Sequence, residues 1–225
     1  RLLLKVAQGE FARTLAFSPD GHYLIVGTSI GFADTKSLTI FELDYGGGVL
    51  ALRGLSSQST ITAISHDGRF LAALAHNWEV AIWDLAHKRL QHLFQAPEGI
   101  LADNAALAFS LDDQRLAFAT SARAVLWNRE SGRMEDSWNL PRGLVQRMCF
   151  DETNCLIHFQ WDRNPGSRSG VCCLRQLLPG GRTNELWREQ PFKGRVLEAA
   201  LASETKLVVA LGEESPNNDS KSILA

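Results

Sequence analysis

Three carboxylates that recur along the chain are the first residues whose types and spacing suggest chemistry. Asp20, Asp67 and Asp112 each follow a serine by two positions, and they are 47 and 45 residues apart. Three carboxylates could bind a cation if they converged on one point. One carboxylate per repeat does not converge, however, and Ser-Pro-Asp-Gly is typical of a tight turn. We therefore interpret these aspartates as turn residues.

Other short patterns lack the residues that catalysis requires. Segment 166–170 resembles a nucleophile elbow, but Arg168 occupies the place of the serine. The glycines at 46–48 are not followed by the Lys-Ser/Thr pair of a phosphate loop. The six histidines are scattered and have no paired nucleophile. The sequence therefore predicts a protein that is not an enzyme and has no catalytic residues and no cofactor.

The four cysteines do not have the spacing of a metal site. They form no Cys-x-x-Cys pair, and no cluster of His accompanies them. Cysteine this sparse, in a chain able to build its own core, favours reduced thiols and a cytoplasmic location. We expect no metal to be bound by the cysteines, which are Cys149, Cys155, Cys172 and Cys173.

The composition is that of a folded protein with a weak overall charge. The chain has 225 residues, of which 45% are hydrophobic and 21% charged, and its formal net charge is -2. Because the chain has no net positive charge, nucleic acid is not an expected partner. No run of about 18 or more apolar residues is present, so no membrane span is expected.

One phrase is repeated along the whole chain. The segment that begins Phe-Ser-Pro-Asp-Gly recurs in altered form, and successive copies start 47, 45, 41 and 51 residues apart. A period of roughly 40 to 50 residues is typical of propeller blades. The first residues of the five copies are Phe17, Ile64, Phe109, Phe150 and Leu201.

Each copy lies between two apolar segments, followed by a third and a more polar fourth. Short apolar runs separated by turn residues indicate β-strands. We predict an all-β fold, a β-propeller of four-stranded antiparallel blades, with about five blades present. We expect these blades to belong to a seven-bladed or larger ring, which makes the chain part of a longer polypeptide, and a closed five-bladed ring is the alternative. The predicted units lie near 11–52, 60–94, 105–138, 144–187 and 196–225, and 1–10 is expected to be the outer strand of a preceding blade.

The third segment of several units ends in a characteristic way. Ile82-Trp83-Asp84-Leu85 ends it in the second unit, and Trp127-Asn128 stands 44 residues later. With the repeated turn, these residues give the sequence a resemblance to the WD40 repeat family over nearly its whole length. The Gly-His dipeptide that precedes the first strand in that family is missing from every unit. The resemblance therefore implies blades with an incomplete polar network and a greater dependence on apolar packing.

The resemblance implies that loops between second and third strands share a face with the connections between blades. Trp and Arg, which are common in binding hot spots, occur in or beside these loops. We predict a contact face there, with the alternative that Trp78 and Trp161 pack against their own blades. The predicted protein-binding residues are Phe32, Asp34, Trp78, Arg123, Trp161, Arg163 and Arg168.

The function implied by the resemblance is a non-catalytic scaffold or sensor module of a larger multidomain protein. Its expected partners are other proteins or neighbouring domains of the same chain, and neither nucleic acid nor a membrane. Two alternatives remain open. The chain could be the propeller of a TolB-like protein or the gating propeller of a prolyl-oligopeptidase-type serine peptidase, or its blades could serve only to stabilise neighbouring domains.

Overall fold

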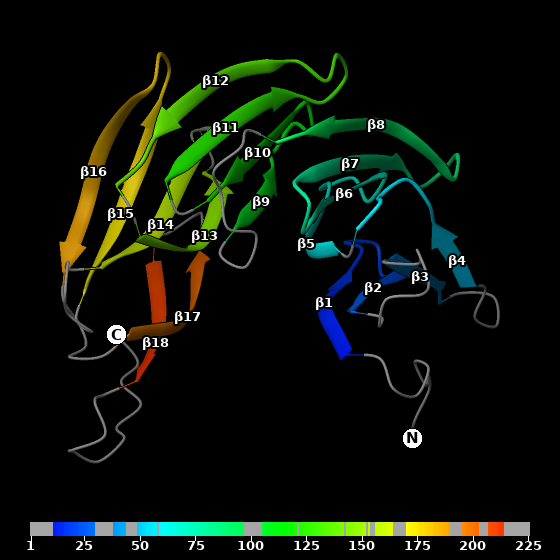
Figure 1. Ribbon diagram of the computed structural model, residues 1–225, viewed down its shortest axis with the longest axis horizontal. Coiled ribbons are helices and arrows are strands. Elements are labelled where there is room, and N and C mark those ends of the chain that lie inside the picture. The colour runs from blue at the N-terminus through cyan, green and yellow to red at the C-terminus, as the bar shows by residue number, and fades with distance from the viewer. Residues whose placement is uncertain are drawn as a thin grey trace. The chain divides into compact units, whose positions relative to one another are not determined.

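The computed structural model describes residues 11–29, 38–43, 49–57, 59–96, 105–120, 122–141, 143–151, 153, 156–163, 170–189, 195–202 and 207–213. These residues form strands and turns only (Figure 1). Within them no helix is long and apolar enough to cross a membrane. The chain divides into two compact units, Arg1–Glu98 and Gly99–Ala225, and each is described by itself.

The first unit contains two four-stranded antiparallel sheets. In each sheet the strands follow one another in chain order. Blade 1 consists of β1 (Phe11–Phe17), β2 (Tyr23–Ser29), β3 (Leu38–Glu42) and β4 (Val49–Leu52). Blade 2 consists of β5 (Ser59–Ile64), β6 (Phe70–Ala75), β7 (Glu79–Asp84) and β8 (Arg89–Gln95).

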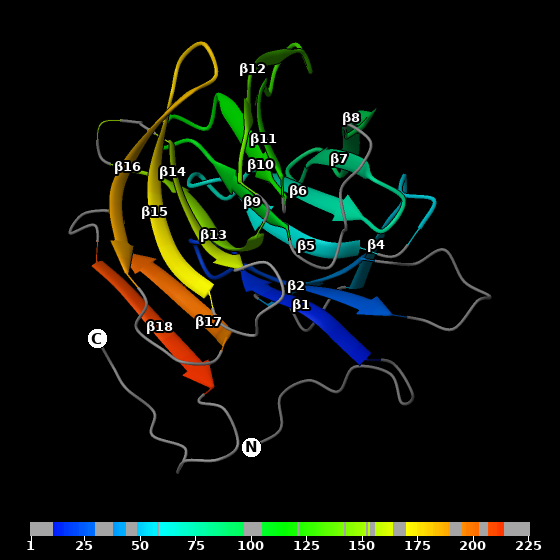
Figure 2. The same ribbon diagram turned by 60° about the vertical axis from the view of Figure 1, so that its left-hand side comes forward.

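The second unit contains two more such sheets and a two-stranded one. Blade 3 consists of β9 (Ala106–Phe109), β10 (Arg115–Ala119), β11 (Arg123–Asn128) and β12 (Met134–Asn139). Blade 4 consists of β13 (Gly143–Phe150), β14 (Leu156–Arg163), β15 (Gly170–Leu178) and β16 (Arg182–Glu189), which lie side by side in Figures 1 and 2. The pair β17 (Arg195–Ala202) and β18 (Leu207–Glu213) follows.

The prediction of an all-β chain with four-stranded antiparallel blades is confirmed. The strands differ in burial according to their place in the blade. All six residues of β6 are buried, and so are five of the six in β7, whereas β8 has none that are fully buried. Inner strands are therefore covered on both faces, which explains why their sequences are continuous apolar runs rather than alternating ones.

The core of each unit lies between successive blades. In the first unit Ile25 and Ile40 of blade 1 pack in one cluster with Leu71 and Trp83 of blade 2. In the second unit the small residues of blade 3, such as Ala117, are in one cluster with larger side chains of blade 4. Those larger residues are Val145, Met148, Phe150, Leu156 and Leu177. Apolar packing between sheets therefore holds neighbouring blades together.

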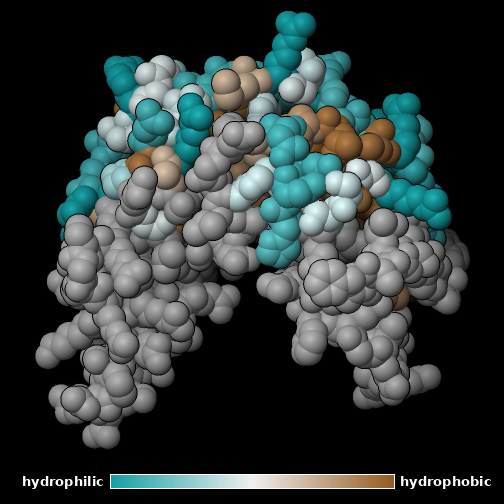
Figure 3. Space-filling view, in the orientation of Figure 1, coloured by the Kyte–Doolittle hydropathy of each residue, from teal (hydrophilic) through white to brown (hydrophobic). Residues whose placement is uncertain are grey.

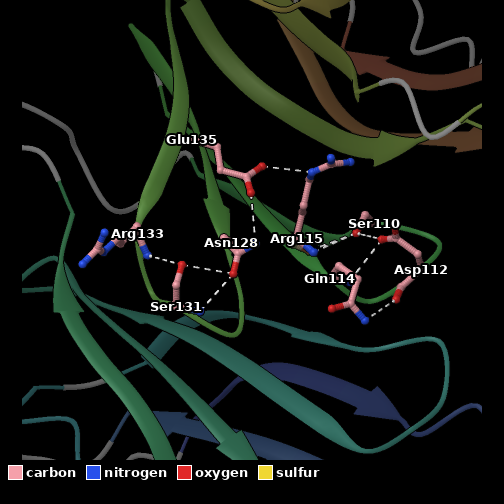
Figure 4. A network of polar contacts seen from close by, with 8 residues as sticks. All are labelled: Ser110, Asp112, Gln114, Arg115, Asn128, Ser131, Arg133 and Glu135. Atoms are coloured by element: carbon pink, nitrogen blue, oxygen red, sulfur yellow. Dashed lines mark hydrogen bonds and ion pairs between the residues drawn. The ribbon is translucent and has the colours of Figure 1, made fainter.

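The repeated turn has one hydrogen-bond pattern in three blades. In blade 3 the Ser110 hydroxyl donates to Asp112 Oδ1 at 2.6 Å and accepts the Arg115 N–H at 2.9 Å, while Asp112 also accepts the Gln114 N–H (Figure 4). Ser65 and Ser18 make the corresponding bonds in blades 2 and 1. The aspartates therefore hold the turn, as the sequence predicts.

In the fourth copy of the turn the carboxylate comes first and the hydroxyl second. Asp151 occupies the place of the serine, and Oδ1 of this buried carboxylate accepts both the N–H and the hydroxyl of Thr153, at 3.0 and 2.7 Å. A carboxylate, like a serine hydroxyl, can accept a backbone N–H two residues later. The altered sequence of this copy therefore keeps a side-chain to backbone bond between Asp151 and Thr153.

The tryptophans at the ends of strands contact main chain of another blade. Trp83 donates its indole N–H to the carbonyl of Arg53, which follows blade 1, at 2.9 Å. Trp138 of blade 3 donates to the carbonyl of Leu178 in blade 4 at 2.6 Å. Trp83 thus bonds to a backbone carbonyl of the connection between blades. The role of Trp138 was not predicted.

Candidate functional site

The turn between β6 and β7 carries a tryptophan at a left-handed position, where glycine is the residue with least strain. The Trp78 N–H donates to the Ala75 carbonyl at 3.0 Å, and φ of Trp78 is 69°. The same backbone bond, from residue i+3 to residue i, closes turns whose left-handed residue is Gly21 or Gly68, and also turns where it is Lys88 (φ 50°) or Asp113 (φ 55°). A bulky side chain is unfavourable in this region, at a cost of about 1 kcal/mol. Trp78 is therefore held in a strained conformation, with its side chain partly exposed.

The same turn is cross-linked to the connection between blades 1 and 2. Glu79 accepts the Ser56 N–H at 2.6 Å and the Ser56 hydroxyl at 2.7 Å. Asn77 donates to the Ser56 hydroxyl at 2.7 Å, and Gln95 donates to the Asn77 carbonyl at 2.6 Å. These bonds join the turn, the connection and the end of β8 into one rigid surface. We call it the Trp78 surface, and it consists of Ser56, Asn77, Trp78, Glu79 and Gln95.

Glu79 gives this surface a negative charge. Burial raises the pKa of its carboxyl, but the hydrogen bonds from Ser56 and Asn77 lower it by more, so the pKa lies below its ordinary value. Among the described residues no Lys, Arg or His forms an ion pair with Glu79. In contrast, Glu42 is paired with Lys88 at 2.7 Å. The charge of Glu79 is therefore held in place by hydroxyl, amide and backbone donors and is not neutralised by a cation within the described part of the chain.

A second unfavourable feature lies in the same turn. The side-chain oxygen of Asn77 is inaccessible to solvent and has no hydrogen-bond partner among the described residues. A buried acceptor without a partner costs on the order of 1 to 3 kcal/mol. Strain and unsatisfied groups concentrate where function requires a geometry that folding alone would not select. The turn between β6 and β7 combines a strained backbone at Trp78 with an unsatisfied acceptor at Asn77.

Exposed leucines extend the surface along the outer strand. The pairing of β7 with β8 places Glu79 opposite Gln95, Ala81 opposite Leu93 and Trp83 opposite Leu90, on one face of the blade. Leu93 is 46% exposed and Leu90 38%. Figure 3 shows apolar surface in the part of the view where β7 and β8 lie. The Trp78 surface is therefore continuous with an apolar strip.

The structure places the predicted binding residues on different elements and not on one loop surface. Trp78 lies on the surface just described. Arg123 begins β11, in the other unit, and its Nε is buried without a hydrogen-bond partner among the described residues. Trp161 and Arg163 were expected in a loop, and this expectation is wrong. A loop over 161–170 was expected between the second and third strands of this unit, but β14 continues through Arg163, with Trp161 opposite Cys172.

Three further predicted residues, Phe32, Asp34 and Arg168, lie outside the described residues. Conversely, sequence reasoning missed Ser56, Glu79 and Leu93. Ser56 and Glu79 are 23 residues apart and meet only because blade 2 packs against the end of blade 1. Leu93 is one apolar residue among several in its strand. No local signal in the sequence distinguishes any of the three.

Metal-binding and acid–base groups can be located only within the described residues. Within them no group of three or more His, Cys, Asp and Glu is placed to hold a metal ion. The nearest approach to an acid–base pair is Asp84 with His87, whose Nδ1 lies 2.9 Å from Asp84 Oδ2. Asp84 also accepts the His87 N–H and an Arg69 N–H, so the carboxylate holds the turn between β7 and β8.

Comparison of the sequence with protein-family models and with curated proteins gives no match. Solved structures do match. The WD40 repeats of RRP9 are 17% identical, with a TM-score of 0.61 over 81% of this chain and 52% of that one. Hydrazine synthase of Kuenenia stuttgartiensis is 15% identical, with a TM-score of 0.69 over 95% of this chain and 60% of that one. The chain thus spans half to three fifths of these structures, and it has their β-propeller fold.

Proposed function

We propose that this chain is a non-catalytic protein-interaction module and that the Trp78 surface is one of its contact sites. The observation that carries the proposal is the rigid cross-link between Ser56 and Glu79, beside a tryptophan held in a strained conformation. A preorganised surface loses little conformational entropy on binding. Tryptophan at its edge is a residue type that often dominates binding energy.

We further propose that the module is a divergent member of the WD40 repeat family and acts within a larger cytoplasmic assembly. The Trp83-Asp84 pair at the end of β7 and the likeness to the WD40 repeats of RRP9 support this proposal. The likeness concerns the fold alone, so the partner is inferred from the surface and not from that structure.

Site-specific crosslinking tests the proposed function. A photoreactive amino acid is placed at Arg53, which is exposed beside Ser56, and at Ala86, which is exposed in the β7–β8 turn of the same unit. We expect a discrete crosslinked protein from position 53 in cells that express the full-length protein, and its loss when Trp78→Gly is added. The same product from both positions, or no product from position 53, would contradict the proposal.

A second candidate function is supported by the likeness to hydrazine synthase, since that protein is named as an enzyme. In this alternative the propeller is a structural or gating part of an enzyme, as in the TolB-like and prolyl-oligopeptidase-type proteins that the sequence suggested. The crosslinking experiment separates the two candidates. A product from position 53 that contains a catalytic domain, and whose turnover falls with Trp78→Gly, favours the second.

A further inference from the structure

We infer that the Trp78 surface binds an extended peptide with a lysine or arginine side chain two positions from an apolar side chain. The basic side chain would contact Trp78 and Glu79, and the apolar one would contact Leu93. The inference rests on the proposed function and adds the chemistry of the partner to it.

The charge of Glu79 selects a cation. Its carboxylate is fixed by Ser56 and Asn77, yet within the described part of the chain no cation is paired with it. An ionised carboxylate can accept about four hydrogen bonds, so bonds from Ser56 leave capacity for a guanidinium or ammonium group. Glu42 and Glu135 differ, because Lys88 and Arg115 already neutralise them.

Trp78 supplies an aromatic side chain at the position before Glu79. Its backbone is anchored on both sides, because its N–H donates to Ala75 and its carbonyl accepts the Ala96 N–H at 2.8 Å. A lysine or arginine head group is attracted to the face of tryptophan within about 6 Å of the ring centre. A carboxylate and an indole at consecutive positions can therefore hold one cationic head group together.

Leu93 sets the distance to the second side chain. It lies opposite Ala81, two residues along β7 from Glu79, and on the same face of the blade. Two residues of a strand span about 7 Å, which is also the separation of side chains i and i+2 in an extended peptide. Leu93 is 46% exposed, so an apolar side chain placed there removes apolar surface from water. Leu90 continues the strip towards the other end of β8.

The position of β8 suits an extended partner. β8 is the last strand of its sheet, and edge strands can take up a further strand through main-chain hydrogen bonds. An edge strand gives affinity without sequence preference, and the side chains of Trp78, Glu79 and Leu93 add the preference. The partner is therefore expected to show alternation, with a basic and an apolar residue on the side that faces this blade.

An oriented array of hexapeptides tests the inference with the full-length protein. One position of each peptide is Arg, Lys, Glu or Ser, and the position two residues later is Leu, Val or Ser. We expect the Arg and Lys peptides with Leu or Val to be retained most, and titration of the best peptide to weaken about tenfold with Glu79→Gln or Trp78→Gly. Leu93→Ser is expected to remove the preference for Leu and Val.

Matched variants and a folding readout accompany the array. Glu42→Gln makes the same change of charge in the same unit and is expected to leave peptide binding unchanged. Thermal denaturation monitored by circular dichroism shows that each variant is folded. Retention without a preference for basic residues, no retention of any peptide, or equal loss in Glu79→Gln and Glu42→Gln overturns the inference. If Arg53 still yields a Trp78-dependent crosslink, the proposed function stands although the inferred peptide chemistry fails.

Discussion

Asp84 and Asn128 occupy the same position in two blades and hold the turn that follows in the same way. Asp84 Oδ1 accepts the His87 N–H at 3.1 Å, and Asn128 Oδ1 accepts the Ser131 N–H at 2.9 Å (Figure 4). An amide and a carboxylate are therefore interchangeable for the backbone at this position. They differ in charge, and only Asp84 has a cation, Arg69, within 3.1 Å.

The charge of Asp84 is expected to make the stability of the first unit sensitive to acid. Burial raises the pKa of Asp84, but the hydrogen bonds from His87 and Arg69 lower it by more. The pKa is therefore about 2, below the ordinary 3.8. Because the pKa is lower in the folded state, the carboxylate stabilises the fold above about pH 4. That contribution, of about 2 kcal/mol, is lost as the pH falls through about 2.

Replacement of Asp84 by Asn tests this dependence, since Asn128 shows that an amide fits such a turn. Asp84→Asn is expected to be less stable than the wild type at neutral pH and to lose less stability on acidification. Urea denaturation between about pH 7 and about pH 2 measures both. Parallel stability curves for the two proteins would contradict the assignment of acid sensitivity to Asp84.

Phe17 and Phe150 end the first strand of their blades, yet they differ in exposure. Phe17 is 61% exposed, whereas Phe150 is 4% exposed and belongs to the cluster between blades 3 and 4. Phe150→Ala is expected to lower the free energy of unfolding by about 3 to 5 kcal/mol because it leaves a cavity. Phe17→Ala is expected to cost less than about 1 kcal/mol. Urea denaturation of the two variants compares them, and similar losses would contradict the burial described.

The repeat was predictable from the sequence because its determinants are local. Ser18, Asp20 and Gly21 specify a turn through bonds among residues at most five positions apart, and apolar runs on each side specify the strands. The continuation of β14 through Arg163 was not predictable in this way. Backbone pairing of Arg163 with Gly170 does not depend on side-chain polarity, so a polar segment that reads as a loop can remain a strand.

The candidate site was predictable only in part. Trp78 was found because tryptophan is common in binding hot spots and this one lies in a short turn between the second and third strands. Ser56 was not found, because its bonds to Glu79 and Asn77 connect segments that meet only when blades 1 and 2 pack. Trp138 is a similar case, since its partner Leu178 is 40 residues away. Contacts between blades are therefore where sequence reasoning fails for this fold.

The strained backbone of Trp78 can be measured by comparing two variants at that position. Trp78→Ala and Trp78→Gly both remove the side chain, but only glycine adopts a φ of 69° without strain. We expect Trp78→Gly to be more stable than Trp78→Ala by about 1 kcal/mol in urea denaturation. Gly68→Ala is the converse control, with φ of 72° at Gly68, and is expected to be destabilised. If alanine and glycine give equal stability at position 78, no strain is stored there.

Cys149 is expected to react slowly with alkylating reagents. Burial raises the pKa of its thiol, and the negative charge of Asp151 raises it further, to about 11 from 9.0. At about pH 8 only about one thiol in a thousand is then the reactive thiolate, so iodoacetamide should modify Cys149 at least tenfold more slowly in the folded protein than in urea. Asp151→Asn is expected to speed the reaction if the turn is retained. Quantitative mass spectrometry of the peptide that contains Cys149 measures the rate, and equally rapid modification of folded and unfolded protein would contradict the raised pKa.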